Sequence, residues 1–179
     1  MNILTPSASI ELLAQAESGG FPRFLGPIET STPLNAAPYI VPLWRLREGD
    51  FLSSRRPFIE KLIAVLDELA IEEIAPQAIL IGGSILFEAV KPADLDGVIF
   101  YRSERAESLA PMGLRQKLEE WKSRGLDVRL IPADGSPVLL IKVAAYFMSL
   151  YTSQRRGRPA PRGPILIDCT DDKLIGYPR

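Results

Sequence analysis

The order of strand-like and helix-like segments after residue 50 most constrains the fold of this chain. Short apolar runs typical of strands lie at residues 78–81, 94–101, 126–131 and 165–167. Helices are predicted over residues 51–70, 84–89, 114–124 (with a start as early as 107) and 137–151. This regular alternation indicates α/β or α+β layering of helices and strands.

The first 50 residues differ from the rest in their proline content. After a short helix predicted over residues 9–17, five prolines lie between Gly19 and Asp50. Proline lacks a backbone donor and disfavours helix in the residue before it, so this segment should be irregular or extended. Its many apolar residues favour packing against the body over a free linker. We therefore divide the chain into an N-terminal arm (1–50) and a domain (51–179).

The composition excludes several classes of active site. The chain contains no histidine and a single cysteine, Cys169. Histidine-dependent triads, the usual zinc sites and an internal disulfide are therefore excluded, and a site of oxygen ligands around Mg²⁺ is the leading option. The 21 basic and 22 acidic residues nearly cancel, which gives no global electrostatic case for binding nucleic acid.

The sequence contains no pattern typical of export or of a membrane. The first residues lack a basic segment followed by an apolar one, and the apolar runs are too short to cross a bilayer. We expect a cytoplasmic protein.

Two neighbouring segments carry residues suited to phosphate and metal chemistry. A strand pattern ends in Gly82-Gly83-Ser84, and after a gap of nine residues Asp94 and Asp96 open the next strand. A glycine turn before a helix lets backbone N–H groups approach a phosphate closely, and the Ser84 hydroxyl can donate to the same oxygens. Residues two apart in a strand point to the same face, so the two carboxylates can share a divalent cation.

Gly-Gly-Ser, a nine-residue gap and Asp-x-Asp before an apolar strand resemble the signature of the DNA polymerase beta-type nucleotidyltransferases. The resemblance spans about residues 51–132, and the whole chain is similar to small bacterial nucleotidyltransferase-like proteins of unassigned activity. It implies an α+β nucleotidyltransferase fold: a short mixed β-sheet backed by helices. It also implies that Asp94 and Asp96 bind Mg²⁺ (or Mn²⁺) and that the turn, Gly82, Gly83 and Ser84, holds a triphosphate.

The resemblance further implies a third carboxylate on a later strand. Asp127 matches best by order and strand context, Asp134 is the fallback and Asp168 is weaker. A surface acid paired with Arg129 or Lys142 is an equally good interpretation of Asp127. Lys142 itself is a candidate phosphate ligand, although a lysine on a helix surface is the ordinary alternative.

An arginine-rich loop near the C-terminus is the remaining candidate site. Arg155, Arg156 and Arg158, with Arg162 after them, suit phosphate or RNA contact, whereas a solvated loop is the simpler interpretation. Tyr146 and Tyr151 precede this loop, and we do not assign them to base stacking.

The hypothesis is an enzyme that moves a nucleoside monophosphate from an NTP to a hydroxyl or phosphate acceptor. The acceptor would be a protein, an RNA or a small molecule. The alternative is a catalytically inactive nucleotidyltransferase-like module that acts by binding a protein partner, as in a toxin–antitoxin or phage-defence pair. A third carboxylate beside Asp94 and Asp96 would favour the enzyme.

Overall fold

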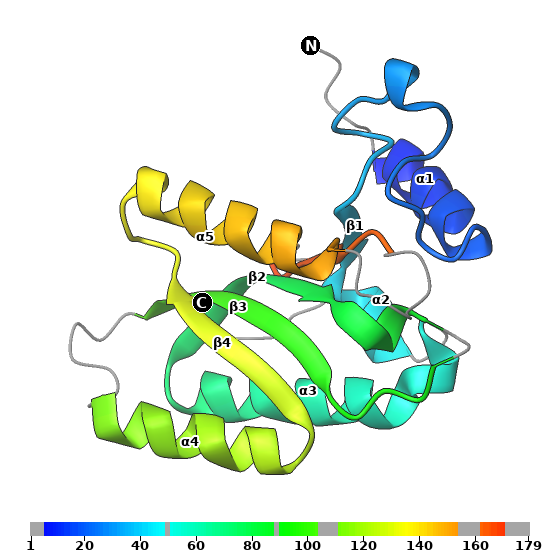
Figure 1. Cartoon of the computed structure of the whole chain (residues 1–179). Coiled ribbons are helices and arrows are strands. Elements are labelled where there is room, and N and C mark those ends of the chain that lie inside the picture. The colour runs from blue at the N-terminus through cyan, green and yellow to red at the C-terminus, as the bar shows by residue number, and fades with distance from the viewer. Residues whose placement is uncertain (1–5, 49–50, 88–89, 104–110, 154–161, 171–179) are drawn as a thin grey trace.

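The computed structural model describes residues 6–48, 51–87, 90–103, 111–153 and 162–170. In this part of the chain, five strands form one mixed sheet in the order β1–β5–β2–β3–β4 (Figure 1). The strands are β1 (Tyr39–Pro42), β2 (Ile74–Gly82), β3 (Leu95–Ser103), β4 (Leu126–Pro132) and β5 (Ile165–Asp168). Strand β2 runs antiparallel to β3 and β5, whereas β3–β4 and β1–β5 are parallel pairs. The expected α+β class with a mixed sheet is confirmed.

Helices cover both faces of this sheet. They are α1 (Pro6–Ser18), α2 (Leu43–Glu48), α3 (Arg56–Ile71), α4 (Pro111–Ser123) and α5 (Pro137–Tyr151), with short 3₁₀ turns η1 (Ile28–Thr30), η2 (Ser53–Arg55) and η3 (Gly83–Leu86). Helices α3 and α4 lie on one face, and α5 lies on the other (Figure 1). None of the helices among the described residues is long and apolar enough to span a bilayer.

The two faces of the sheet follow from strand alternation. On the face towards α3 and α4, Ile79 of β2 is paired with Ile99 of β3, and both are fully buried. Helix α3 packs here through apolar side chains at helical spacing: Ile59, Leu62, Val65, Leu66 and Leu69. The alternate residues of β3, beginning with Asp96 and Val98, therefore point to the opposite face, which α5 covers.

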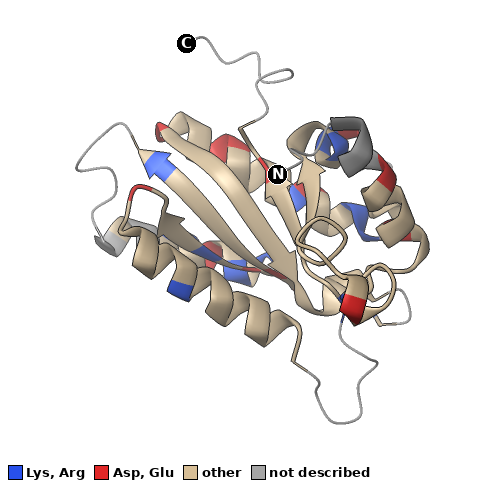
Figure 2. Ribbon diagram, turned by 90° about the horizontal axis from the view of Figure 1, so that it is seen from above, with Lys and Arg blue, Asp and Glu red and all other residues tan. Residues whose placement is uncertain are grey.

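Helix α5 is held less deeply than α3. None of its side chains for which burial is described is buried, and those turned inwards are only half-buried. On its outer side Val138, Ile141 and Tyr146 are 76%, 70% and 61% exposed. Figure 2 shows this helix almost free of charged residues.

The N-terminal arm is more regular than expected. It contributes strand β1, which pairs with β5 at the edge of the sheet, and helix α2 directly after it. Proline is tolerated in an edge strand, so Pro42 can end β1 without breaking an interior ladder. The expectation of an irregular or extended segment is therefore wrong for α2, while β1 is extended and the division at residue 50 stays a prediction.

Three element boundaries also differ from expectation. Helix α3 begins at Arg56 instead of Phe51, because Leu52 has a φ of +50° and Phe51 is fully buried as an anchor ahead of the helix. Strand β2 begins at Ile74 and runs through Pro76, where the pairing with β3 shifts register and so accommodates the missing donor. The helix expected over 84–89 is the shorter η3, and residues 88–89 lie outside the described part.

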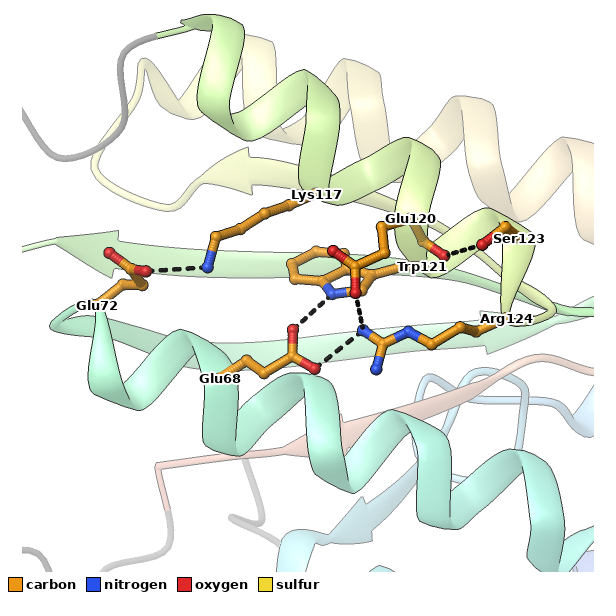
Figure 3. Close-up of polar contacts among 7 residues, drawn as sticks. All are labelled: Glu68, Glu72, Lys117, Glu120, Trp121, Ser123 and Arg124. Atoms are coloured by element: carbon orange, nitrogen blue, oxygen red, sulfur yellow. Dashed lines mark hydrogen bonds and ion pairs between the residues drawn. The ribbon is translucent and has the colours of Figure 1, made fainter.

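A polar cluster ties α4 to α3 (Figure 3). The indole N–H of the fully buried Trp121 donates to Glu68 Oε2 at 2.8 Å, and Arg124 Nη2 donates to Glu68 Oε1 at 2.9 Å. At the other end of the interface Lys117 Nζ lies 2.9 Å from Glu72 Oε1. Glu68 thus satisfies the one polar group of the largest buried side chain.

The same cluster fixes the entry into β4. Directly after Arg124, Gly125 adopts a φ of +86°, as expected for a glycine after a helix, and its carbonyl accepts a hydrogen bond of 2.9 Å from Leu95 N. Lys61 Nζ donates to the Arg124 carbonyl at 2.8 Å. These contacts hold the start of β4 beside the start of β3.

We expect Glu68→Ala to lower the free energy of unfolding by about 1–3 kcal/mol, because it leaves the buried indole N–H without an acceptor. Urea denaturation followed by tryptophan fluorescence measures this loss. The control is Glu120→Ala, whose carboxylate is exposed and lies 3.9 Å from Arg124, and which should cost below about 0.5 kcal/mol. Equal losses in the two variants would contradict the assignment.

The stabilisation by Glu68 should also depend on pH. Burial acts to raise the pKa of this carboxyl, but hydrogen bonds from Trp121 and Arg124, together with the charges of Arg124 and Lys117, outweigh it, so the pKa is lowered. A lowered folded pKa means that the contribution is present above the unfolded pKa and is lost as the pH falls through the folded one. The difference between wild type and Glu68→Ala should therefore shrink at acid pH.

Candidate functional site

The candidate site lies where β2 ends and β3 and β4 begin. In the register of the sheet, Gly82 is paired with Asp96, and Asp96 is paired with Asp127. Three neighbouring strands therefore bring the glycine turn and two acids to the same edge of the sheet. Asp94, one residue before β3, lies two positions from Asp96 and joins them.

The three acids form a cluster that could hold a metal ion. One carboxylate oxygen from each of Asp94, Asp96 and Asp127 lies within 4.8 Å of the others, and all three residues are half-buried. Like charges at such spacing repel each other by several kcal/mol in partly buried surroundings, so the cluster favours a bound cation. Because the donors are all hard oxygens, they suit Mg²⁺ or Mn²⁺ and not a soft metal.

Basic residues balance part of this charge from the β4 side. Arg129 Nη2 lies 3.3 Å from Asp127 Oδ1, and Lys122 Nζ lies 3.5 Å from Asp127 Oδ2. The ion-pair interpretation of Asp127 is therefore correct as to Arg129, and Asp127 belongs to the acidic cluster as well. Both cations have exposed side chains, which leaves them free to move when the carboxylate takes another partner.

The second glycine of the turn lies directly against the cluster. Gly83 has a φ of +76°, and a Cβ built on it would lie 2.5 Å from Asp96 Oδ2. Only glycine allows both this backbone conformation and this approach. The backbone of the turn therefore runs beside the carboxylates. Ser84 follows at the start of η3 and is half-buried.

The first glycine meets a residue that the sequence does not reveal as part of the site. A Cβ on Gly82 would lie 2.4 Å from Cγ of Tyr151, so the tyrosine ring rests on the bare backbone of β2. Burial raises the pKa of the Tyr151 phenol, and the charges of Asp96 and Asp127 raise it further, against a smaller opposing effect of Arg129. Tyr151 thus lies within electrostatic reach of the acidic cluster.

The other predicted site residues lie elsewhere. Lys142 is exposed on α5, and Asp134 is exposed beyond β4. Asp168 accepts hydrogen bonds from the backbone and hydroxyl of Thr170 and is not part of the cluster. Arg155, Arg156 and Arg158 lie outside the described residues. Arg162 donates to the Gly19 carbonyl at 3.2 Å and so ties the end of that loop to the N-terminal arm.

A cavity of about 390 Å³ adjoins the turn on the side of η3. Ile85 and Leu86 of η3 line it together with Arg55, Arg162 and Phe21. Arg55 is fixed there by hydrogen bonds from its guanidinium to the carbonyls of Phe87 and Val90. The three acids are not among its lining residues.

The comparisons with known proteins identify a family and nothing closer. Residues 45–168, more than half of the chain, match the family described as a family of unknown function, DUF6932. No curated protein and no solved structure matches the chain. The matched segment contains the glycine turn, the three acids and Tyr151. The chain belongs to the DUF6932 family.

Proposed function

We propose that this protein is a Mg²⁺-dependent nucleotidyltransferase of the DNA polymerase beta type. It would transfer a nucleoside monophosphate from an NTP to a hydroxyl or phosphate acceptor and release pyrophosphate. The observation that carries this proposal is the position of Asp127, which lies beside Asp94 and Asp96 as a third carboxylate. The placement supports an enzyme over a catalytically inactive binding module, which has no need of three converging acids.

Each residue of the site has a separate role in this proposal. Asp94, Asp96 and Asp127 hold the cation, whose charge would stabilise the leaving pyrophosphate and ease deprotonation of the acceptor. The backbone of Gly83 and the Ser84 hydroxyl donate to the triphosphate, next to Asp96. Asp127 accepts the proton of the acceptor, for which its pairing with Arg129 must loosen. Lys142 stays a candidate phosphate ligand.

Removing one acid of the cluster should abolish stabilisation by Mg²⁺ without destabilising the metal-free protein. We expect Asp94→Asn to leave the metal-free protein as stable as wild type or more stable, because one like charge is lost from the cluster. In wild type, Mg²⁺ at about 100 times its dissociation constant should add about 2.7 kcal/mol of stability, and Asp94→Asn should abolish this gain. Thermal unfolding with and without Mg²⁺ measures both effects.

The matched control for this experiment is Asp134→Asn, because Asp134 is exposed and outside the cluster. It removes the same charge and should keep the full Mg²⁺ stabilisation. Loss of the gain in both variants, or in neither, would mean that the three acids are not a specific metal site.

The glycine turn can be tested by the binding of NTPs. Gly83→Ala places a side chain on a left-handed residue, which costs about 1–2 kcal/mol, and forces a Cβ against Asp96. We expect Mg²⁺-dependent NTP binding, measured by calorimetric titration, to weaken more than about 100-fold, beyond the loss typical of residues that merely support a metal site. The control is Gly113→Ala on α4, where an added Cβ meets open space. Unchanged binding in Gly83→Ala would remove the turn from the site.

A further inference from the structure

Tyr151 occupies a position that the proposed reaction does not yet explain. It is the last residue of α5, and its ring packs against Gly82 on the face of the sheet that carries the acids. Phe147, one turn earlier, contacts it with ring centroids 5.9 Å apart. This inward side of α5 therefore ends in a phenol at the edge of the candidate site.

The pairing of the strands locates this ring relative to the acids. From β2, the neighbouring strand carries Asp96 and the next one carries Asp127, with adjacent strands about 4.8 Å apart. Atoms Cβ, Cγ and Cδ2 of Tyr151 are the ones that lie over Gly82. Because Asp96 is paired with Gly82 and points to the same face, the ring that rests on Gly82 lies next to the strand that carries Asp96.

We propose that Tyr151 is itself an acceptor: the protein attaches a nucleoside monophosphate to its own Tyr151 hydroxyl. The inference rests on the proposed function and specifies an acceptor for that same site. Two observations carry it: the contact of the ring with Gly82 of the glycine turn, and the pairing of Gly82 with Asp96 on the neighbouring strand. A tyrosine of the same chain, packed against the glycine turn, needs no second substrate to bring a hydroxyl to the site.

The reaction balances without any further reactant. The Tyr151 oxygen forms a bond to the α-phosphorus of the NTP as the bond from that phosphorus to the oxygen bridging to the β-phosphate breaks. Pyrophosphate leaves, and the phenol proton passes to a carboxylate of the cluster. The product is a phosphodiester between tyrosine and the nucleoside.

This arrangement predicts two properties of the reaction. Because the phenol lies in the same chain as the acids, the reaction is intramolecular, and its rate constant should not change when the protein is diluted. Because the product occupies the site, each chain should accept one nucleotide. Tyr146 serves as the internal comparison, since it lies on the same helix but is 61% exposed on the outer side.

The decisive experiment is mass spectrometry of the intact full chain after incubation with each NTP and Mg²⁺. We expect a gain of one nucleoside monophosphate per chain, mapped to Tyr151 by peptide fragmentation. Tyr151→Phe keeps the ring contact with Gly82 and should remove the modification, as should Asp96→Asn. Tyr146→Phe should be modified like wild type.

A second readout needs no turnover. Tyrosine labelled with an NMR-active carbon at Cζ gives one signal for each of the five tyrosines, and the signal missing in Tyr151→Phe belongs to Tyr151. Addition of Mg²⁺ alone should shift this signal and leave that of Tyr146 in place. An unchanged Tyr151 signal in a protein that binds Mg²⁺ would contradict the placement of the phenol at the site.

The remaining outcomes distinguish the two proposals. If NTP binds with Mg²⁺ but no nucleotide is attached, or if Tyr151→Phe is modified as fully as wild type, the self-modification is wrong and the nucleotidyltransferase proposal stands. If calorimetry detects no NTP binding, both proposals fail together.

Discussion

The parallel pairing of β3 with β4 is the constraint on which the candidate site depends. It places Asp96 opposite Asp127, so that two consecutive strands begin with acids at one edge of the sheet. Bringing three carboxylates within 4.8 Å of one another is unfavourable in a metal-free protein. The fold must therefore impose this register by contacts elsewhere, since the acids themselves oppose it.

Those contacts lie on the opposite face of the sheet. A parallel pair needs a crossover, and here α4 supplies it. Trp121 and Arg124 of this connection both bind Glu68 on α3, and the Gly125 carbonyl receives the hydrogen bond from Leu95 that begins the ladder. A slip of one residue would turn Asp127 towards the core and expose Val128, which is almost fully buried. Hydrophobic burial on the face covered by α3 and α4 thus keeps the repelling charges together on the other face.

The sequence predicts well those features that depend on local pattern. The apolar run in 94–101 and the alternation in 126–131 located the two strands, and the shared direction of residues two apart put Asp94 and Asp96 together. The resemblance to nucleotidyltransferases selected Asp127 over Asp134 and Asp168, and the cluster contains Asp127. Strand β1 was not predicted, because its pairing with β5 joins segments more than a hundred residues apart and its prolines suggested irregular chain.

The orientation of helix α5 could not be predicted from the sequence pattern. Its sequence is apolar on nearly every side, with Lys142 as the only charged residue, so periodicity gives its length but not the face that meets the sheet. The sequence of the helix therefore does not indicate that Tyr151 belongs to the site. The only sequence feature related to it is Gly82, which has no side chain at the place where the ring packs. A glycine in a strand can mark the close approach of another group, but it does not name that group.

The two glycines of the turn are therefore required for different structural reasons. Gly82 makes room for Tyr151, and Gly83 provides the left-handed backbone and the approach to Asp96. Both requirements come from contacts within the protein and not from a bound nucleotide. Gly-Gly-Ser by itself would therefore persist in a module that had lost catalysis. Asp127 is different: it faces two other acids, and its pairing with Lys122 and Arg129 could be kept without them. The convergence of the three carboxylates, more than the glycine turn, is therefore the feature that argues for chemistry at this site.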